Sequence, residues 1–116
     1  MAKLTLFGIP NCDTVKKARR WLEQNDIAYQ FHDFRRDGLD EKRLKQWFRL
    51  TDWEQLLNRR SRTWRELNDA DKENITQTKA IKLMLAQPSI IKRPVAVRTS
   101  NVTIGFDSKT YSTEFL

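Results

Sequence analysis

The sequence has a single cysteine, Cys12, and a single histidine, His32. A lone cysteine cannot form a disulfide within its own chain, and one cysteine with one histidine cannot supply the four ligands of a Cys/His zinc site. We therefore expect neither an internal disulfide nor a metal site. Any chemistry of the thiol must involve a partner molecule.

Long apolar runs are also absent, since none reaches the roughly 20 residues that a membrane-spanning helix requires. The first residues lead into a strand rather than a signal peptide, so we expect a cytoplasmic protein with no membrane association. With 116 residues, three glycines, three prolines and no low-complexity stretch, the chain fits one domain over residues 1–116.

Charge of one sign is in excess, because 22 lysines and arginines face 15 aspartates and glutamates. The basic residues are spread over several predicted elements, with no basic tail and no aromatic RNA-binding motif. We interpret them as a solvated surface that attracts small anions, and we do not expect nucleic-acid binding.

The apolar pattern changes period along the chain. Residues 3–7 alternate as a strand, residues 13–25 repeat at helical spacing, and residues 27–34 predict a second strand that Asp37-Gly38 ends. A helix between two strands indicates a parallel βαβ unit. Asp13 or Thr14 is expected to cap the helix.

The middle of the chain, about residues 36–87, is predicted to be all-helical, because apolar residues recur three or four positions apart in four segments: 41–50, 53–58, 64–67 and 76–87. A β-branched strand at 95–99, a turn at Ser100-Asn101, a second strand at 102–106 and a short helix at 108–116 complete the chain. The predicted fold is therefore α/β, ordered as βαβ, a helical insert and ββα.

Cys12 comes directly before the first predicted helix. There, unpaired backbone N–H groups and the positive end of the helix dipole favour a thiolate. Lys16 and Arg19 follow one and two turns along, and either side chain could lower the thiol pKa further. A buried structural cysteine is the alternative, and the position alone does not decide between the two.

Three ordered segments resemble the arsenate reductase-like (ArsC/Spx) family of thioredoxin-fold proteins. They are Phe7-Gly-Ile-Pro-Asn-Cys-Asp-Thr14, Leu56-Leu-Asn-Arg-Arg-Ser61 and Ile91-Lys-Arg-Pro-Val95. Phe31-His-Asp-Phe34 and Thr63-Trp-Arg65 are similar to the YffB-type branch, whose members are proposed glutathione-dependent thiol reductases. The resemblance implies a thioredoxin-like fold with a mixed four-stranded sheet.

The same resemblance implies that Cys12 is the nucleophile and that Arg93 faces it from a loop in which Pro94 is cis. A guanidinium there can hold an oxyanion or a glutathione carboxylate by two hydrogen bonds. Together with Pro94, the expected substrate-binding residues are Asn11, Lys16, Arg59 and Arg60.

The sequence departs from related patterns at two places. The final hairpin, Ile104-Gly-Phe-Asp107, lacks the third arginine that arginine-type arsenate reductases place near the cysteine, and this weakens the case for arsenate reduction. Val15 stands where Spx-type regulators have a second cysteine, so oxidised Cys12 must be resolved by an outside thiol. His32 lies inside a predicted strand, and we favour a structural role over general-base catalysis.

These observations favour a glutathione-dependent thiol–disulfide reductase, an oxidoreductase with no tightly bound cofactor and with glutathione as cosubstrate. Its expected partners are glutathione or a glutaredoxin-like thiol protein, with a small oxyanion as a further possibility. Two alternatives stay open: an arsenate reductase that uses glutathione and glutaredoxin, and a non-catalytic Spx-like regulator that binds RNA polymerase.

Overall fold

A computed structural model describes residues 3–116, and these residues form two compact units. The first, here called the sheet unit, comprises the described residues up to Gly38 together with Arg93–Leu116. The second, the helical unit, comprises Leu39–Lys92. The organisation of residues 1–116 as a single domain stays a prediction.

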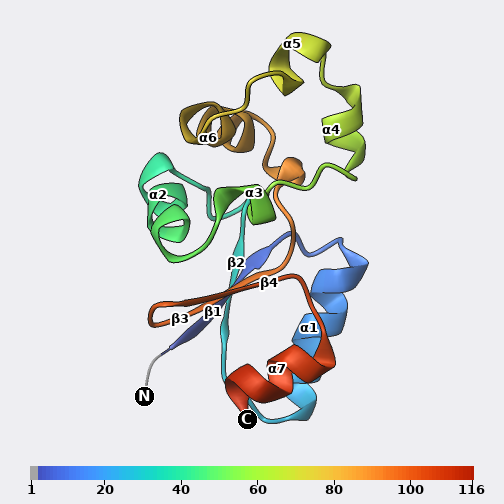
Figure 1. The fold of residues 1–116 in the computed structure, drawn as a ribbon. Coiled ribbons are helices and arrows are strands. Elements are labelled where there is room, and N and C mark those ends of the chain that lie inside the picture. Colours follow the sequence, from blue (N-terminus) through green and yellow to red (C-terminus); the bar gives the residue numbers. More distant parts are fainter. Residues whose placement is uncertain (1–2) are drawn as a thin grey trace. The chain divides into compact units, whose positions relative to one another are not determined.

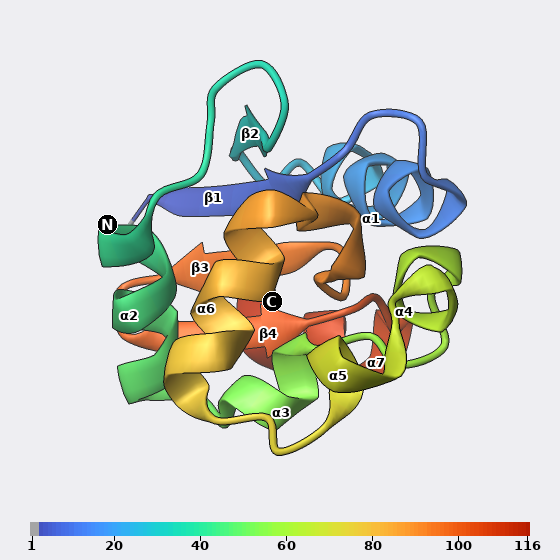
Figure 2. The same ribbon diagram turned by 90° about the horizontal axis from the view of Figure 1, so that it is seen from above.

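The sheet unit is built on four strands: β1 (Leu4–Gly8), β2 (Gln30–Asp33), β3 (Val95–Arg98) and β4 (Asn101–Ile104). Figure 2 shows them side by side in the order β2-β1-β3-β4. β1 and β2 are parallel, whereas β1–β3 and β3–β4 are antiparallel. The predicted mixed four-stranded sheet is confirmed.

Two helices, α1 (Asp13–Gln24) and α7 (Ser108–Phe115), cover the same face of this sheet (Figure 1). Alternating residues of β1 point to that face, and the period of α1 turns its apolar stripe towards them. The buried cluster that results draws on both strands and helices: Leu4, Leu6, Ala18, Leu22, Ala96 and Tyr111. This core anchors α1, the helix that follows Cys12. The closing helix that the sequence predicted at 108–116 is also confirmed.

The second strand is shorter than predicted, because Ile27 belongs to the C-terminal end of α1 and residues 28–29 lie outside the sheet. Asp26 adopts a left-handed conformation with φ 55°, its N–H donates to the Glu23 carbonyl, and the Ile27 N–H donates to the Leu22 carbonyl. These two bonds form a Schellman motif, usually built around glycine. The apolar character of Ile27 therefore marks a helix end and not a strand.

The hairpin turn predicted at Ser100-Asn101 is wrong by one residue. The structure pairs Arg98 with Asn101, so the turn is Thr99-Ser100 and Thr99 has φ 55°. A β-branched residue rarely occupies the left-handed region, and propensity therefore misplaced the turn.

The helical unit contains four α-helices near the predicted positions: α2 (Glu41–Leu50), α3 (Trp53–Leu56), α4 (Arg62–Glu66) and α6 (Gln77–Ala86). Two further short elements, α5 (Asp69–Lys72) and the 3₁₀ helix η1 (Pro88–Ile90), were not predicted. A bridge between Leu57 and Ile91 brings the two ends of the unit together. Its buried residues include Leu44 and Trp47 of α2 and Ile81 and Met84 of α6.

Within residues 3–116, no helix is long and apolar enough to cross a membrane. The same residues contain no group of three or more His, Cys, Asp or Glu side chains that could hold a metal ion.

Candidate active site

Cys12 is the N-cap residue of α1, at the end of the loop that leaves β1. Its backbone is extended, with φ −141° and ψ 124°, and its carbonyl accepts the first helical hydrogen bond from the Lys16 N–H at 2.9 Å. The predicted cap by Asp13 or Thr14 is wrong, because Asp13 is already the first helical residue and no side chain accepts a capping hydrogen bond. Cys12 therefore occupies the position that a serine or aspartate fills in most helices.

The thiol stands at this position without accepting a capping hydrogen bond. The backbone N–H groups of Thr14 and Val15 nevertheless favour the thiolate and lower the pKa of Cys12. An N-cap acceptor ordinarily receives the N–H of the second or third helical residue, and these are the residues Thr14 and Val15. The sequence predicted unpaired N–H groups at the helix start. The structure identifies the two that act on the thiol as those of Thr14 and Val15, because it places the N-cap at Cys12.

The environment lowers the pKa of Cys12 below its ordinary value. Partial burial of the thiol opposes ionisation, but the Val15 N–H, the hydrogen bond and charge of Arg93, and the Thr14 N–H together outweigh it. The thiol is only partly buried, so a reagent or substrate can reach it. A partly exposed sulfur with a lowered pKa is typical of a reactive cysteine and not of a structural one.

Arg93 is the basic side chain that acts on the thiol. It precedes β3, its guanidinium donates to the Cys12 side chain, and the peptide bond to Pro94 is cis, as the resemblance implied. The loop is tied to the end of β4 by the Gly105 N–H, which donates to the Pro94 carbonyl at 2.8 Å. The structure thus brings together two residues that are remote in sequence.

The two other basic residues considered for the thiol are placed differently. The Arg19 Nε donates to the Tyr29 hydroxyl at 3.0 Å, and its Cζ lies 4.1 Å from the centroid of the Phe31 ring. This cation–π contact directs Arg19 towards β2. Lys16 is exposed on the first turn of α1, and Asn11 is exposed immediately before Cys12. Substrate binding by Lys16 and Asn11 stays a prediction.

Arg59 and Arg60 belong to the helical unit, in the turn between α3 and α4. The Arg60 N–H donates to the Asn58 side chain at 3.1 Å, and the Arg59 Cζ lies 5.7 Å from the Trp64 ring centroid. Both side chains are exposed, and their role in substrate binding stays a prediction.

His32 has structural contacts in the sheet unit. Its Nε2 lies 2.7 Å from the Gly38 carbonyl oxygen, and its ring centroid lies 4.7 Å from that of Phe7. With Nε2–H donating to that carbonyl, the ring is held between strand and turn, in agreement with the structural role favoured from the sequence.

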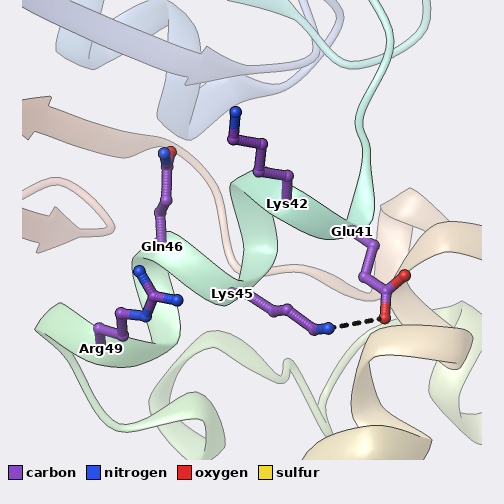
Figure 3. A pocket seen from close by; sticks show the side chains of 5 residues that line it. All are labelled: Glu41, Lys42, Lys45, Gln46 and Arg49. Atoms are coloured by element: carbon purple, nitrogen blue, oxygen red, sulfur yellow. Dashed lines mark ion pairs between the residues drawn. The ribbon is translucent and has the colours of Figure 1, made fainter.

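Each of the two units has a pocket of its own, and Cys12 lines neither of them. The pocket in the helical unit has a volume of about 310 Å³ and runs along α2, where it is lined by Glu41, Lys42, Lys45, Gln46 and Arg49. Figure 3 shows Lys42 and Gln46 extending from one side of the helix. Glu41 and Lys45 form an ion pair at 3.2 Å. The other, of about 640 Å³, includes Leu4 and Tyr29 and lies at the end of β1 remote from Cys12. Neither is lined by Cys12 or Arg93.

A model of the ArsC family matches residues 7–113, which is nearly the whole chain and includes both Cys12 and Arg93. The chain belongs to the ArsC family. The resemblance seen in the three sequence segments is thereby confirmed.

Individual ArsC-family relatives agree with this assignment. A solved structure of a YffB protein is 42% identical, covers 98% of this chain and 100% of its own, and superposes with a TM-score of 0.94. A structure described as an arsenate reductase (ArsC) related protein from Brucella melitensis is 45% identical, covers 97% and 94% of the two chains, and has a TM-score of 0.79. These likenesses confirm the predicted thioredoxin-like α/β fold.

A more distant branch of similarity leads to regulators. The global transcriptional regulator Spx of Listeria innocua is 26% identical over 106 residues, which are 90% of this chain and 80% of that protein. The ArsC fold is thus found in proteins named as reductases and in proteins named as regulators, and the fold alone does not choose between these functions.

Proposed function

We propose that this ArsC-family protein is a glutathione-dependent thiol–disulfide reductase in which Cys12 is the only nucleophile. The observation that carries the proposal is the position of Cys12 at the N-cap of α1, where two helix N–H groups and the Arg93 guanidinium lower the pKa of the thiol. The thiolate is the reactive form of cysteine, and each of these three donors favours it.

The reaction proceeds by two exchanges. The Cys12 thiolate attacks one sulfur of a disulfide, the Cys12–S bond forms as the disulfide bond breaks, and the departing thiolate takes a proton from water. The thiolate of reduced glutathione then attacks the mixed disulfide, which releases Cys12 as a thiolate and leaves oxidised glutathione or a glutathione mixed disulfide. Where a glutathione mixed disulfide forms, a second reduced glutathione displaces the remaining substrate thiol and leaves as oxidised glutathione. Two glutathione thiols thus supply the two electrons that reduce the substrate disulfide.

Arg93 has two roles in this scheme. In the free protein it stabilises the thiolate, and in the complex it binds a carboxylate of glutathione, to which a guanidinium can donate two parallel hydrogen bonds. No second cysteine is present in the sequence, so the mixed disulfide must be resolved by an outside thiol.

Intact-mass measurement after incubation with oxidised glutathione tests the proposal. Wild-type protein is expected to gain one glutathione and lose it again on addition of excess reduced glutathione, and Cys12→Ser is expected to gain none. Wild-type protein that stays unmodified would refute the proposal.

Arsenate reduction is a second candidate, because a relative that is 45% identical is described as an arsenate reductase (ArsC) related protein. A multiply charged oxyanion requires several cationic donors around the attacked atom, and the final hairpin segment Ile104-Gly-Phe-Asp107 contains no arginine. We therefore expect arsenate turnover, coupled to glutathione and glutaredoxin, to stay at the level of a Cys12→Ser blank. Turnover above that blank would favour this candidate.

A regulatory role is a third candidate, favoured by the similarity to Spx. Binding to a protein partner such as RNA polymerase would not require the thiol. It would be recognised by a pull-down in which wild type and Cys12→Ser retain the polymerase equally.

A further inference from the structure

Gly8 ends β1 directly opposite the first turn of α1. A Cβ atom built on Gly8 would lie 2.9 Å from Cγ2 of Val15 and 3.6 Å from its Cγ1. The first distance is shorter than a carbon–carbon contact of about 3.5–4.0 Å, so a side chain at position 8 would collide with Val15. The two elements approach this closely only because residue 8 is a glycine.

Neither partner in this contact can move away easily. Gly8 pairs with Asp33 of β2, and its carbonyl accepts the Phe34 N–H at 2.9 Å, which holds the end of the strand. Val15 is fully buried, and a β-branched side chain in a helix has one strongly preferred rotamer. The remaining way to relieve the collision is a displacement of the first turn of α1.

That turn carries backbone donors of the active site, because Cys12 is the N-cap residue of α1 and the N–H groups of Thr14 and Val15 in the turn favour its thiolate. The attraction between an N–H group and a thiolate weakens steeply with distance and angle, so a small displacement of Val15 weakens this stabilisation. We propose that the absence of a side chain at Gly8 positions these two N–H groups against Cys12, which makes Gly8 a positioning residue for thiol reactivity. The inference rests on the proposed function, in which Cys12 reacts as a thiolate.

The charged groups around the thiol stay unchanged in such a variant. Arg93 faces it from the loop before β3, and Asp13 and Lys16 lie in the first turn of α1. A change in thiol ionisation on substitution of Gly8 therefore reports the backbone donors and not a change of side-chain charge.

The test is a double-mutant cycle between Gly8 and Val15, read by the rate of Cys12 alkylation with iodoacetamide as a function of pH. Gly8→Ala is expected to raise the midpoint of the alkylation profile by about one pH unit, which lowers the thiolate fraction about tenfold at pH values well below both midpoints. In a Val15→Ala background, where the colliding methyl groups are absent, Gly8→Ala is expected to change the alkylation profile by less than twofold.

Gly38→Ala is the matched control, because a Cβ there has no heavy atom within 4 Å and Gly38 makes no contact with the thiol. Gly38 has φ 83°, so an alanine is strained and lowers stability without changing the alkylation profile. Thermal unfolding of every variant is measured in parallel. A purely structural role for Gly8 would change stability alone.

An alkylation profile for Gly8→Ala that matches wild type would overturn the inference. So would a shift of the alkylation midpoint by Gly8→Ala that is equally large in the wild-type and in the Val15→Ala background. If Gly8→Ala does not fold, Val15→Ile takes its place, because it enlarges the same contact from the helix side. The inference then requires that Val15→Ile raises the thiol pKa. Failure of wild type to form the glutathione mixed disulfide would refute the proposed function while leaving this cycle interpretable.

Discussion

The reactivity of Cys12 depends on the balance between burial, which raises its pKa, and three sources of stabilisation, of which Arg93 is the only side chain. Arg93→Ala is expected to raise the thiol pKa by about one unit. This corresponds to the free energy of a hydrogen bond to a charged group that is partly exposed to solvent. Arg93→Lys should give a smaller rise, because it keeps the charge and loses the guanidinium geometry.

Alkylation kinetics across pH measure both variants. Lys17→Ala, which removes a charge from an exposed position of α1, is the control and should behave as wild type. Equal pKa values for wild type and Arg93→Ala would show that the guanidinium does not stabilise the thiolate.

The lowered pKa also links stability to pH. In the unfolded chain Cys12 ionises near its ordinary value of about 8.5, whereas in the folded protein its pKa is lower. The fold therefore favours the thiolate, and this contribution to stability is complete above the ordinary pKa and is lost as pH falls through the lowered value.

Urea unfolding of wild type and Cys12→Ser at a series of pH values, under reducing conditions, measures this contribution. The free energy of unfolding of wild type relative to Cys12→Ser should rise from the lowered pKa up to about pH 8.5. A difference that does not vary with pH would contradict the lowered pKa.

At the scale of elements, α1 presents the thiol because its buried stripe is fixed to the sheet. Leu22 is fully buried in the cluster that joins α1 to β1, β3 and α7. Leu22→Ala is expected to lower the free energy of unfolding by about 3 kcal/mol, through lost burial and the cavity left behind. Chemical denaturation measures it, with Lys17→Ala as a surface control; a loss below about 0.5 kcal/mol, the usual range for surface substitutions, would contradict this packing.

Elements with a strong apolar period were predictable from the sequence. The bounds of α2 match the prediction, and those of α1 differ by one residue. Both helices have a buried apolar stripe, formed by Leu44 and Trp47 in α2 and by Val15, Ala18 and Leu22 in α1. α5 was missed because its four residues, Asp-Ala-Asp-Lys, have no buried side chain. Its start depends on the Asn68 side chain, which accepts the Asp71 N–H, a local cap that apolar periodicity does not reveal.

The site was predictable in part. The strand, loop and helix around Cys12 follow from local pattern, but the contact with Arg93 joins residues that only the folded sheet unit brings together. It was expected solely from the family resemblance. The Gly8–Val15 contact had no sequence signal beyond a glycine in the motif, because the approach of two backbones depends on tertiary packing.

At the scale of the whole molecule, the basic residues of the helical unit are expected to act on substrate and not on the thiol. Arg60→Ala should slow exchange with anionic oxidised glutathione several-fold, because an exposed cation speeds the encounter with an anion. It should leave exchange with neutral hydroxyethyl disulfide and the alkylation profile unchanged. Stopped-flow rates with the two disulfides at low and high salt measure the difference, and equal slowing with both would contradict a role in anion binding.

The central claim is that Cys12 is held as a thiolate by the α1 N-terminus and Arg93. Its most direct test is the rate of alkylation of the wild-type protein between pH 4 and 10, with the site of modification verified by peptide mapping. We predict a single transition at Cys12 with a midpoint below the ordinary thiol value of about 8.5. A midpoint at or above that value would contradict it.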